Sequence, residues 1–287
     1  MYPSEFEYYR ADDVTNALDL LADNPGAEIL AGGHSLLPTM KSGLSSPPAL
    51  VDIGHIDSIK GIDVEDDVVK VGALTNYATV ADSEVVQEEV PVVAQAAHEI
   101  GDIQVRNRGT VGGNVAHADP ASDLPAAVLA ADATLVVEGP DGEREVDVDE
   151  FFFGMYATDV AEDEILTRIE LPRRGATGAY VKKPSPSSGY AMVGVAASVL
   201  FDDDGAVSEA RVAANGVQDH AVRLGPVEEE LTGNSLDEDV VDAAGERADE
   251  DMEEFMLMDD LQASGEFRAQ LLRVFTKRAL NRVAESA

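Results

Sequence analysis

Hydrophobic positions recur along the chain at spacings that predict short strands alternating with amphipathic helices. Val14 and Leu21 fall on one face of a predicted helix over residues 12–24. Pro91 opens another helix, which Gly101 ends because glycine favours the C-terminal cap. Segments that alternate or are rich in β-branched residues predict strands at residues 28–30, 50–53, 68–74, 133–139 and 165–171.

The pattern changes near residues 172–189, where three prolines, three glycines and three serines predict a boundary. Beyond it, strands are expected at 192–201 and 206–214, and a long helix at about 266–284. The fold class expected is α+β, ending in a small antiparallel sheet with helices. We place two subdomains at about 1–57 and 58–175 within a first domain at 1–175, and a second domain at 178–287.

Charge is the most unusual feature of the composition. The 56 acidic residues outnumber the 20 basic ones and give a net charge of −36. Nucleic acid and anionic membranes, which bind clustered Lys and Arg, would be repelled. Because the acidic residues are spread from end to end, we interpret them as a halophilic surface adapted to high salt. A specific basic partner is the alternative.

Features that the sequence lacks also limit its chemistry. No run reaches the roughly 18 apolar residues of a membrane span. The N-terminus has neither the basic start nor the apolar stretch of a signal peptide, so we expect a cytoplasmic protein. The chain has no cysteine, which excludes disulfides and argues against an iron–sulfur cluster held by this chain. Any electron carrier bound here would be an organic cofactor.

A first glycine-rich segment, Ala31-Gly32-Gly33-His34-Ser35, follows a predicted strand. Glycine lets the backbone approach a ligand closely and adopt positive φ. Successive backbone N–H groups can form an anion-binding nest, which would suit a pyrophosphate with Ser35 as a further donor. A plain tight turn is the alternative.

A second segment, Arg106-Asn107-Arg108-Gly109-Thr110-Val111-Gly112-Gly113-Asn114, has the same ingredients and two positive charges. Neither segment has the G-x-G-x-x-G pattern of a Rossmann site or the G-K-[ST] of a Walker loop. Two glycine turns in one domain therefore suggest a ligand with two phosphates, or an extended nucleotide.

A third polar stretch places His117, Asp119 and Asp123 close together in the sequence. A metal site is conceivable from these three residues, but no H-E-x-x-H motif supports it. A carboxylate that accepts hydrogen bonds from ribose hydroxyls is the preferred interpretation of Asp123. Capping of the following helix is the alternative.

Together these segments resemble the FAD-binding medium subunit of aerobic carbon monoxide dehydrogenases, within the xanthine dehydrogenase (molybdenum hydroxylase) family. The similarity extends from about residue 3 to the C-terminus. It implies a two-subdomain FAD-binding domain of the vanillyl-alcohol-oxidase/PCMH type, followed by a C-terminal flavoprotein domain. The matching runs are A-G-G-H-S-L-L-P at 31–38, I-G-D-I-Q-V-R-N-R-G-T-V-G-G-N at 100–114 and H-A-D-P-A-S-D at 117–123.

The resemblance also implies a role for individual residues. The FAD pyrophosphate would be wrapped by Ile29, Leu30, Ala31, Gly32, Gly33, His34, Ser35 and Leu36. The segment that closes on it from the other side would comprise Thr110, Val111, Gly112, Gly113 and Asn114. Asp123 would bind the adenosine ribose, Ile100 would line the cofactor pocket, and Leu166 would contribute backbone contacts near the adenine or flavin.

Two further positions match residues beside the flavin ring. Lys182 falls where the family often has a basic residue, with Lys183 as an equal candidate because this stretch is rich in Pro and Ser. Tyr190 matches an aromatic residue that covers the isoalloxazine, and a core aromatic at the start of a strand is the alternative. We expect no catalytic base and no metal ion in this chain.

The resemblance implies partners as well. A large subunit with a molybdenum cofactor and a small subunit with 2Fe–2S clusters would complete a heterotrimer, commonly doubled. The flavin would receive electrons from the clusters and pass them to an external acceptor. A stand-alone flavin oxidoreductase and a non-redox nucleotide-binding scaffold are the alternatives. The resemblance implies that the large subunit determines the substrate.

Overall fold

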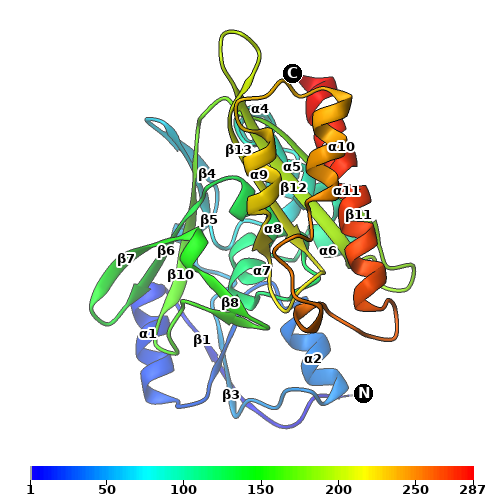
Figure 1. Cartoon of the computed structure of the whole chain (residues 1–287). Coiled ribbons are helices and arrows are strands. Elements are labelled where there is room, and N and C mark those ends of the chain that lie inside the picture. Colours follow the sequence, from blue (N-terminus) through cyan, green and yellow to red (C-terminus); the bar gives the residue numbers. More distant parts are fainter. Residues whose placement is uncertain (1) are drawn as a thin grey trace.

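The computed structural model describes residues 2–287, beginning with a three-stranded parallel sheet in the order β1-β3-β2 (Figure 1). Helices connect these strands. Asp13 caps the first helix, because its carboxylate accepts a hydrogen bond from the Asn16 backbone N–H at 2.7 Å. The elements are β1 (Glu7–Arg10), α1 (Val14–Asp23), β2 (Glu28–Leu30), α2 (Leu36–Ser42), β3 (Ala49–Asp52) and the 3-10 turn η1 (Asp57–Ile59).

The second sheet is antiparallel, with five strands in the order β4-β5-β10-β6-β7. Six helices are inserted between β5 and β6. The strands are β4 (Ile62–Glu65), β5 (Val68–Gly72), β6 (Thr134–Gly139), β7 (Gly142–Asp147) and β10 (Ile165–Pro172). The helices are α3 (Tyr77–Ala81), α4 (Glu84–Glu89), α5 (Pro91–Glu99), α6 (Ile103–Arg106), α7 (Val111–His117) and α8 (Asp123–Ala130).

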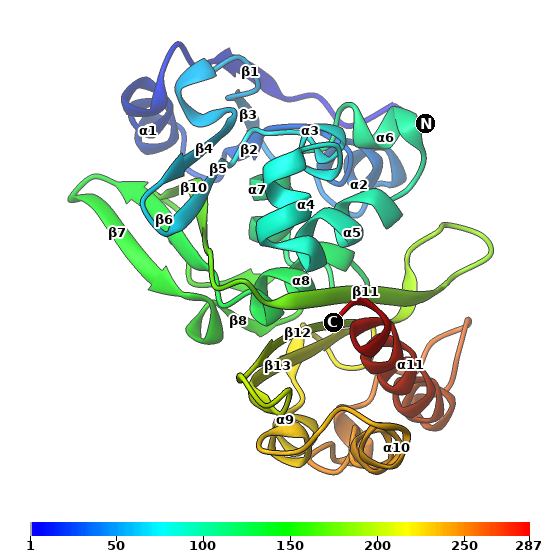
Figure 2. The same ribbon diagram turned by 90° about the horizontal axis from the view of Figure 1, so that it is seen from above.

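The third sheet is antiparallel in the order β11-β12-β13-β14 and has helices on both faces. Helices α5 and α8 cover one face, and α9, α10 and α11 lie on the other side (Figure 2). Its elements are β11 (Thr177–Pro184), β12 (Ala191–Phe201), β13 (Val207–Asn215), β14 (Val222–Arg223), α9 (Gly225–Leu231), α10 (Glu238–Glu246), η3 (Glu254–Met256) and α11 (Gly265–Ser286). A small hairpin between the larger sheets comprises η2 (Val148–Glu150), β8 (Phe152–Gly154) and β9 (Ala157–Thr158).

The expected α+β class is confirmed, as is a final antiparallel sheet with helices. Strand β11, at residues 177–184, lies within the stretch where a boundary between domains was predicted. That strand pairs along its length with β12 and buries Ala179 and Tyr180, so tertiary pairing outweighs its glycine and proline content. None of the helices in residues 2–287 combines the length and hydrophobicity that a membrane crossing requires.

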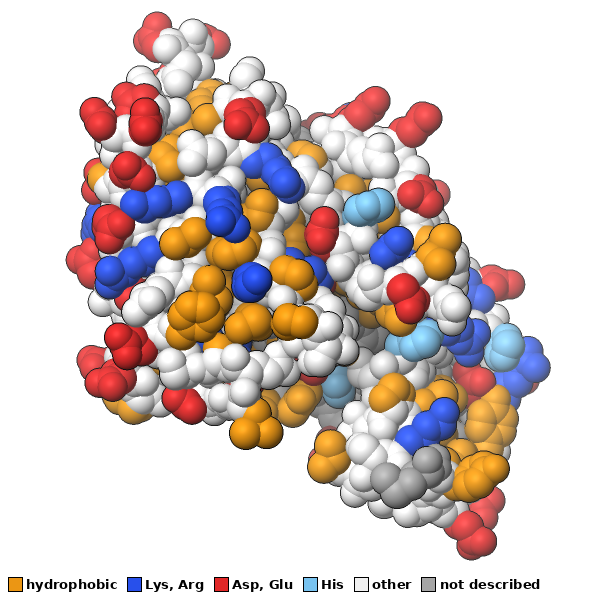
Figure 3. Space-filling model, turned by 90° about the vertical axis from the view of Figure 1, so that its right-hand side faces the viewer, with side chains coloured by type: hydrophobic (Ala, Val, Ile, Leu, Met, Phe, Trp, Pro, Cys, Tyr) orange, Lys and Arg blue, Asp and Glu red, His pale blue; other side chains and the backbone are white. Residues whose placement is uncertain are grey.

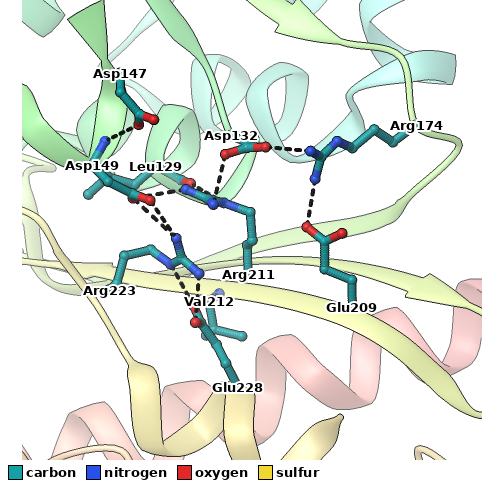
Figure 4. Close-up of polar contacts among 10 residues, drawn as sticks. All are labelled: Leu129, Asp132, Asp147, Asp149, Arg174, Glu209, Arg211, Val212, Arg223 and Glu228. Carbon is teal, nitrogen blue, oxygen red and sulfur yellow. Dashed lines mark hydrogen bonds and ion pairs between the residues drawn. The ribbon is translucent and has the colours of Figure 1, made fainter. Parts of the chain in front are cut away.

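Three arginines join the third sheet to the helices and turns that precede it (Figure 4). Arg211 on β13 pairs with Asp132, just after α8, at 2.7 Å and with Asp149 in η2 at 2.8 Å. Arg223 on β14 also pairs with Asp149. Arg174, before β11, pairs with the other oxygen of Asp132 at 2.7 Å. Each aspartate therefore receives two guanidinium groups, which compensates charges that are partly removed from water.

Candidate functional site

The two glycine-rich segments lie against each other in space. A Cβ atom added to Gly32 would stand 2.6 Å from the carbonyl oxygen of Arg108, 2.9 Å from Gly109 Cα and 3.0 Å from Thr110 N. Only glycine allows this backbone-to-backbone approach. The two segments, which the sequence predicts to hold one ligand, are therefore in direct contact.

The first segment offers unused hydrogen-bond donors. It follows β2, and Gly33 has a φ of 75°, in the left-handed region that favours glycine. Within residues 2–287, the backbone N–H groups of Gly32, Gly33, His34 and Ser35 donate no hydrogen bond. Successive free N–H groups at a turn suit a negatively charged group such as a pyrophosphate. Of the other predicted residues here, Ile29, Leu30, Ala31 and Leu36 are all partly buried.

The second segment is not a glycine turn, which corrects the prediction. Thr110 is the N-cap of α7, and Val111, Gly112, Gly113 and Asn114 form its first turns. The N–H groups of Val111 and Gly112 already donate to Thr75 and Ala73 at 2.9 and 2.8 Å. Gly113 N donates to the Thr110 hydroxyl at 3.3 Å. This segment contributes a close-packed wall rather than free donors.

Asn114 links the second segment to two other helices. Its amide nitrogen donates to the Tyr77 hydroxyl at 3.0 Å, and its amide oxygen accepts from the Ser122 hydroxyl at 2.7 Å. Tyr77 is buried, and this burial raises its pKa. Tyr77 and Ser122 were not singled out in the sequence, because no motif marks a side chain that a distant helix brings into place.

The Lys182 side chain is buried, and its ammonium group is fully hydrogen-bonded. Its ammonium group donates to Asp123 Oδ2 at 2.7 Å, to the Glu99 carbonyl at 2.8 Å and to the Gly189 carbonyl at 3.0 Å. These three bonds use all its donors. Lys183 points the other way along β11 and is exposed, since side chains alternate along a strand. Lys182 therefore faces Asp123 and is bonded to the loop that precedes Tyr190.

Both carboxylate oxygens of Asp123 also have hydrogen-bond partners within the protein. Its side chain is 5% exposed, its Oδ2 binds Lys182, and its Oδ1 accepts from the Tyr180 hydroxyl at 2.5 Å. Burial raises the pKa of Asp123, while Lys182 and Tyr180 oppose that rise. A ribose hydroxyl would have to enter this network, so the predicted ribose contact stays a prediction. Helix capping by Asp123 is absent, because Ser122 occupies the N-cap position.

Tyr190 connects this network to the first glycine segment. It ends the loop between β11 and β12, is 41% exposed, and lies close to the Ser35 side chain. Burial raises the pKa of Tyr190, and the nearby Ser35 side chain opposes this rise. On the face drawn in Figure 3, a recess separates the lobe that carries α2 from the rest of the molecule.

Ile100 and Leu166 are both buried, on two different elements. Ile100 is buried at the end of α5, beside the Glu99 carbonyl that Lys182 binds. Leu166 is buried on β10. Its neighbour Thr167 accepts a backbone hydrogen bond from Ala73, which in turn abuts Gly112.

His117, Asp119 and Asp123 do not form a metal site. His117 stacks against Tyr156 with ring centroids 5.0 Å apart, and burial lowers its pKa. Asp119 accepts the Ala121 N–H at 2.9 Å, while Asp123 faces Lys182. No group of three His, Asp or Glu side chains in residues 2–287 is placed to hold a metal ion.

The site thus combines a run of free N–H groups, a close backbone wall and a partly exposed aromatic side chain, Tyr190. These features fit an organic cofactor that carries a pyrophosphate and a planar ring. The family comparisons agree: residues 4–174 match the FAD binding domain in molybdopterin dehydrogenase, and residues 178–283 match the CO dehydrogenase flavoprotein C-terminal domain. The chain belongs to this family of flavoprotein subunits.

Individual relatives match over the whole chain. The carbon monoxide dehydrogenase medium chain of Hydrogenophaga pseudoflava is 37% identical over 98% of this chain and 98% of its own. The glyceraldehyde dehydrogenase medium chain of Sulfolobus acidocaldarius is 33% identical over 99% of this chain and 100% of its own. A solved structure of carbon monoxide dehydrogenase from H. pseudoflava superimposes with a TM-score of 0.94, covering 99% of each chain at 37% identity.

Proposed function

We propose that this chain is the FAD-binding, electron-transferring subunit of a molybdenum-containing hydroxylase. The observation that carries the proposal is the run of free N–H groups at Gly32–Ser35, held against the backbone of Arg108–Thr110. FAD would supply the reversible uptake and release of electrons, and the protein its position and surroundings. Membership of the flavoprotein family supports this assignment.

We assign a different part of the cofactor to each group of residues in the site. We assign the pyrophosphate to the N–H groups of the first segment, with α7 as the opposing wall. Tyr190 would lie beside the flavin ring, and Lys182 positions its loop through the Gly189 carbonyl. Ile100 and Leu166 complete the pocket. For Asp123 we retain the ribose contact, which requires a hydroxyl to join its bonds to Tyr180 and Lys182.

We also propose the partners and the setting. The chain would join a large molybdenum-cofactor subunit and a small subunit with 2Fe–2S clusters in a doubled heterotrimer, in a cytoplasm of high salt. Residues 1–175 would form the FAD-binding domain, and residues 178–287 the C-terminal domain. The relatives act, by their names, on carbon monoxide and on glyceraldehyde. The substrate of this assembly is therefore a property of its other subunits.

Purification in molar KCl tests the proposal in two steps. The isolated chain should carry FAD, identified by its visible flavin absorbance and by release on denaturation. A colourless chain that takes up no added FAD would refute the flavin assignment. The tagged chain, captured from its native host, should then bring down chains that contain iron and molybdenum. A flavoprotein that brings down neither would support the stand-alone alternative.

A further inference from the structure

Large hydrophobic side chains are exposed in one stretch near the C-terminus. Between α10 and α11, Phe255 is 85% exposed and Leu261 is fully exposed. On the outer side of α11, Phe267 and Val274 are 44% and 43% exposed. Contiguous exposed apolar surface marks an interaction site more often than isolated apolar residues do. We define the docking surface as Phe255, Met256, Leu261, Phe267, Val274 and Arg278.

Helix α11 has a charge opposite to that of the whole chain. Between Glu266 and Glu285 it contains five basic residues and no acidic one, although the chain has 56 acidic residues in 287. Arg273 and Lys277 turn toward carboxylates of α10 and the loop after it. Arg278 lies over the Phe275 ring at 4.6 Å, and within residues 2–287 it pairs with no carboxylate.

Figure 3 looks onto the side of the molecule that includes α11. Blue and orange side chains gather over the part to the left of the recess, and red ones crowd its outer edge. Between Glu266 and Glu285, α11 has no acidic residue, unlike most stretches of similar length in this acidic chain. Interface centres are depleted in carboxylates and enriched in aromatic residues, Met and Arg.

The docking surface is anchored beside the candidate cofactor site. Met258 N donates to the Val217 carbonyl at 2.8 Å, and Gly216 N donates to the Pro120 carbonyl at 2.7 Å, next to α8. The buried Arg268 donates to the Met192 and Gly216 carbonyls at 2.5 and 2.7 Å.

Arg268 also holds the loop between α10 and α11, because its guanidinium pairs with Asp260 at 2.8 Å. The loop is thereby fixed to the start of β12, two residues after Tyr190. A protein bound on this surface would lie near Tyr190.

We propose that this docking surface binds the partner protein that exchanges electrons with the flavin, and that the partner presents an apolar patch with carboxylates facing Arg278. The inference rests on the proposed function and adds the location and chemistry of the contact. A second copy of this chain fits less well, since a two-fold contact along α11 would bring unpaired arginines of both copies together. An anionic membrane is disfavoured by the acidic residues that surround the surface.

The test compares two double variants of the tagged chain in the native complex. V274E/R278E changes the docking surface, and V64E/R10E changes an equally exposed valine and an exposed arginine at other strands. Iron, molybdenum and flavin are measured in complexes captured in molar KCl. We expect V64E/R10E to match the unaltered chain, and V274E/R278E to lose at least tenfold of its iron per flavin while keeping its flavin.

The outcomes separate this inference from the proposed function. Retention of iron by V274E/R278E, or loss of molybdenum alone, would overturn the docking surface but leave the flavoprotein assignment intact. If the unaltered chain captures no iron, both proposals fail. Should V274E/R278E lose flavin through misfolding, F255E replaces it, because that side chain is almost fully exposed.

The chemistry of the partner is tested with R278K. A carbodiimide joins the introduced amine directly to a neighbouring carboxylate. We expect this variant to keep its iron and to cross-link to an Asp or Glu of another subunit. Cross-links only to a second copy of this chain, or pelleting of the isolated chain with anionic vesicles, would contradict the proposal.

Discussion

Gly32 lies where the two glycine-rich segments are in closest contact, so a side chain added there should disturb both segments. We expect Gly32→Ala to reduce the free energy of unfolding by about 1–3 kcal/mol, because the added Cβ meets backbone atoms that cannot rotate away. The protein should also retain less FAD, because the backbone shift that relieves the clash moves the free N–H groups of the first glycine segment. Equilibrium denaturation and the flavin content of the purified protein measure the two effects.

Gly225→Ala is the matched control for this change. Its added Cβ would find its nearest neighbour, Asp251 Oδ2, 3.9 Å away. This variant should retain its stability and its flavin. Full flavin retention by Gly32→Ala would show that the close approach of the two segments is not needed for binding.

Lys182 and Asp123 allow a pH-dependent prediction. Burial raises the pKa of Asp123, so the folded state holds its proton to higher pH than the unfolded chain does. Ionising this buried carboxyl lowers the free energy of unfolding. The loss is absent below the pKa of Asp123 in the unfolded chain, and it develops as the pH rises through the pKa of Asp123 in the folded state. Lys182→Met removes the compensating charge and should raise that pKa further. We expect a loss of about 3–5 kcal/mol at neutral pH and a smaller loss in mild acid.

Denaturant unfolding of Lys182→Met, measured on both sides of neutrality in molar salt, checks this expectation. Lys183→Met is the control and should change little, because Lys183 is exposed. The pair Lys182→Met with Asp123→Asn should recover part of the stability, since no buried charge then remains. A deficit that is equal at every pH would exclude the proposed uncompensated carboxylate.

Elements with strong local patterns were predictable, and elements held by distant contacts were not. Strands β12 and β13 and helix α11 follow from their hydrophobic periodicity alone. In contrast, α7 contains two adjacent glycines, which disfavour a helix. It forms because Thr110 caps it, and because Gly112 packs on Ala73 where no Cβ would fit.

The candidate site, too, could be predicted from the sequence only in part. Its glycine segments were predictable from composition and from the family resemblance. Whether Lys182 or Lys183 faces Asp123 was not, because it depends on which face of β11 packs against α5. The engagement of Asp123 by Tyr180 depends likewise on strand pairing that a linear pattern does not contain.

The junction between α8 and β13 is expected to depend on Arg211. Arg211→Met removes charge-assisted bonds to Asp132 and Asp149, and a third bond to the Leu129 carbonyl at 3.1 Å. We expect the free energy of unfolding to fall by about 1–3 kcal/mol, because the bonded groups are only partly exposed. Arg10→Met, at an exposed position, should change stability little. Equal denaturation midpoints for the two variants would contradict a stabilising role of Arg211 at this junction.

At the scale of the whole molecule, the charge of −36 predicts a dependence on salt. At about 0.15 M salt the screening length is about 8 Å, so neighbouring carboxylates repel; at about 1 M it falls to about 3 Å. We expect the thermal midpoint to rise by roughly 10 °C or more between these conditions, given about 2–4 °C per kcal/mol for a chain of this size. Far-ultraviolet circular dichroism, recorded during heating in KCl, measures it.

The type of solute distinguishes screening from general stabilisation. Sucrose stabilises compact states by exclusion from the surface, without screening charge. If repulsion among carboxylates limits stability, KCl should restore the fold where sucrose restores it only in part. Replacing acidic residues of the exposed run Asp202–Asp204 with Asn should also lessen the salt requirement. An equal response to KCl and sucrose would mean that the acidic surface has a role other than adaptation to salt, such as binding a basic partner.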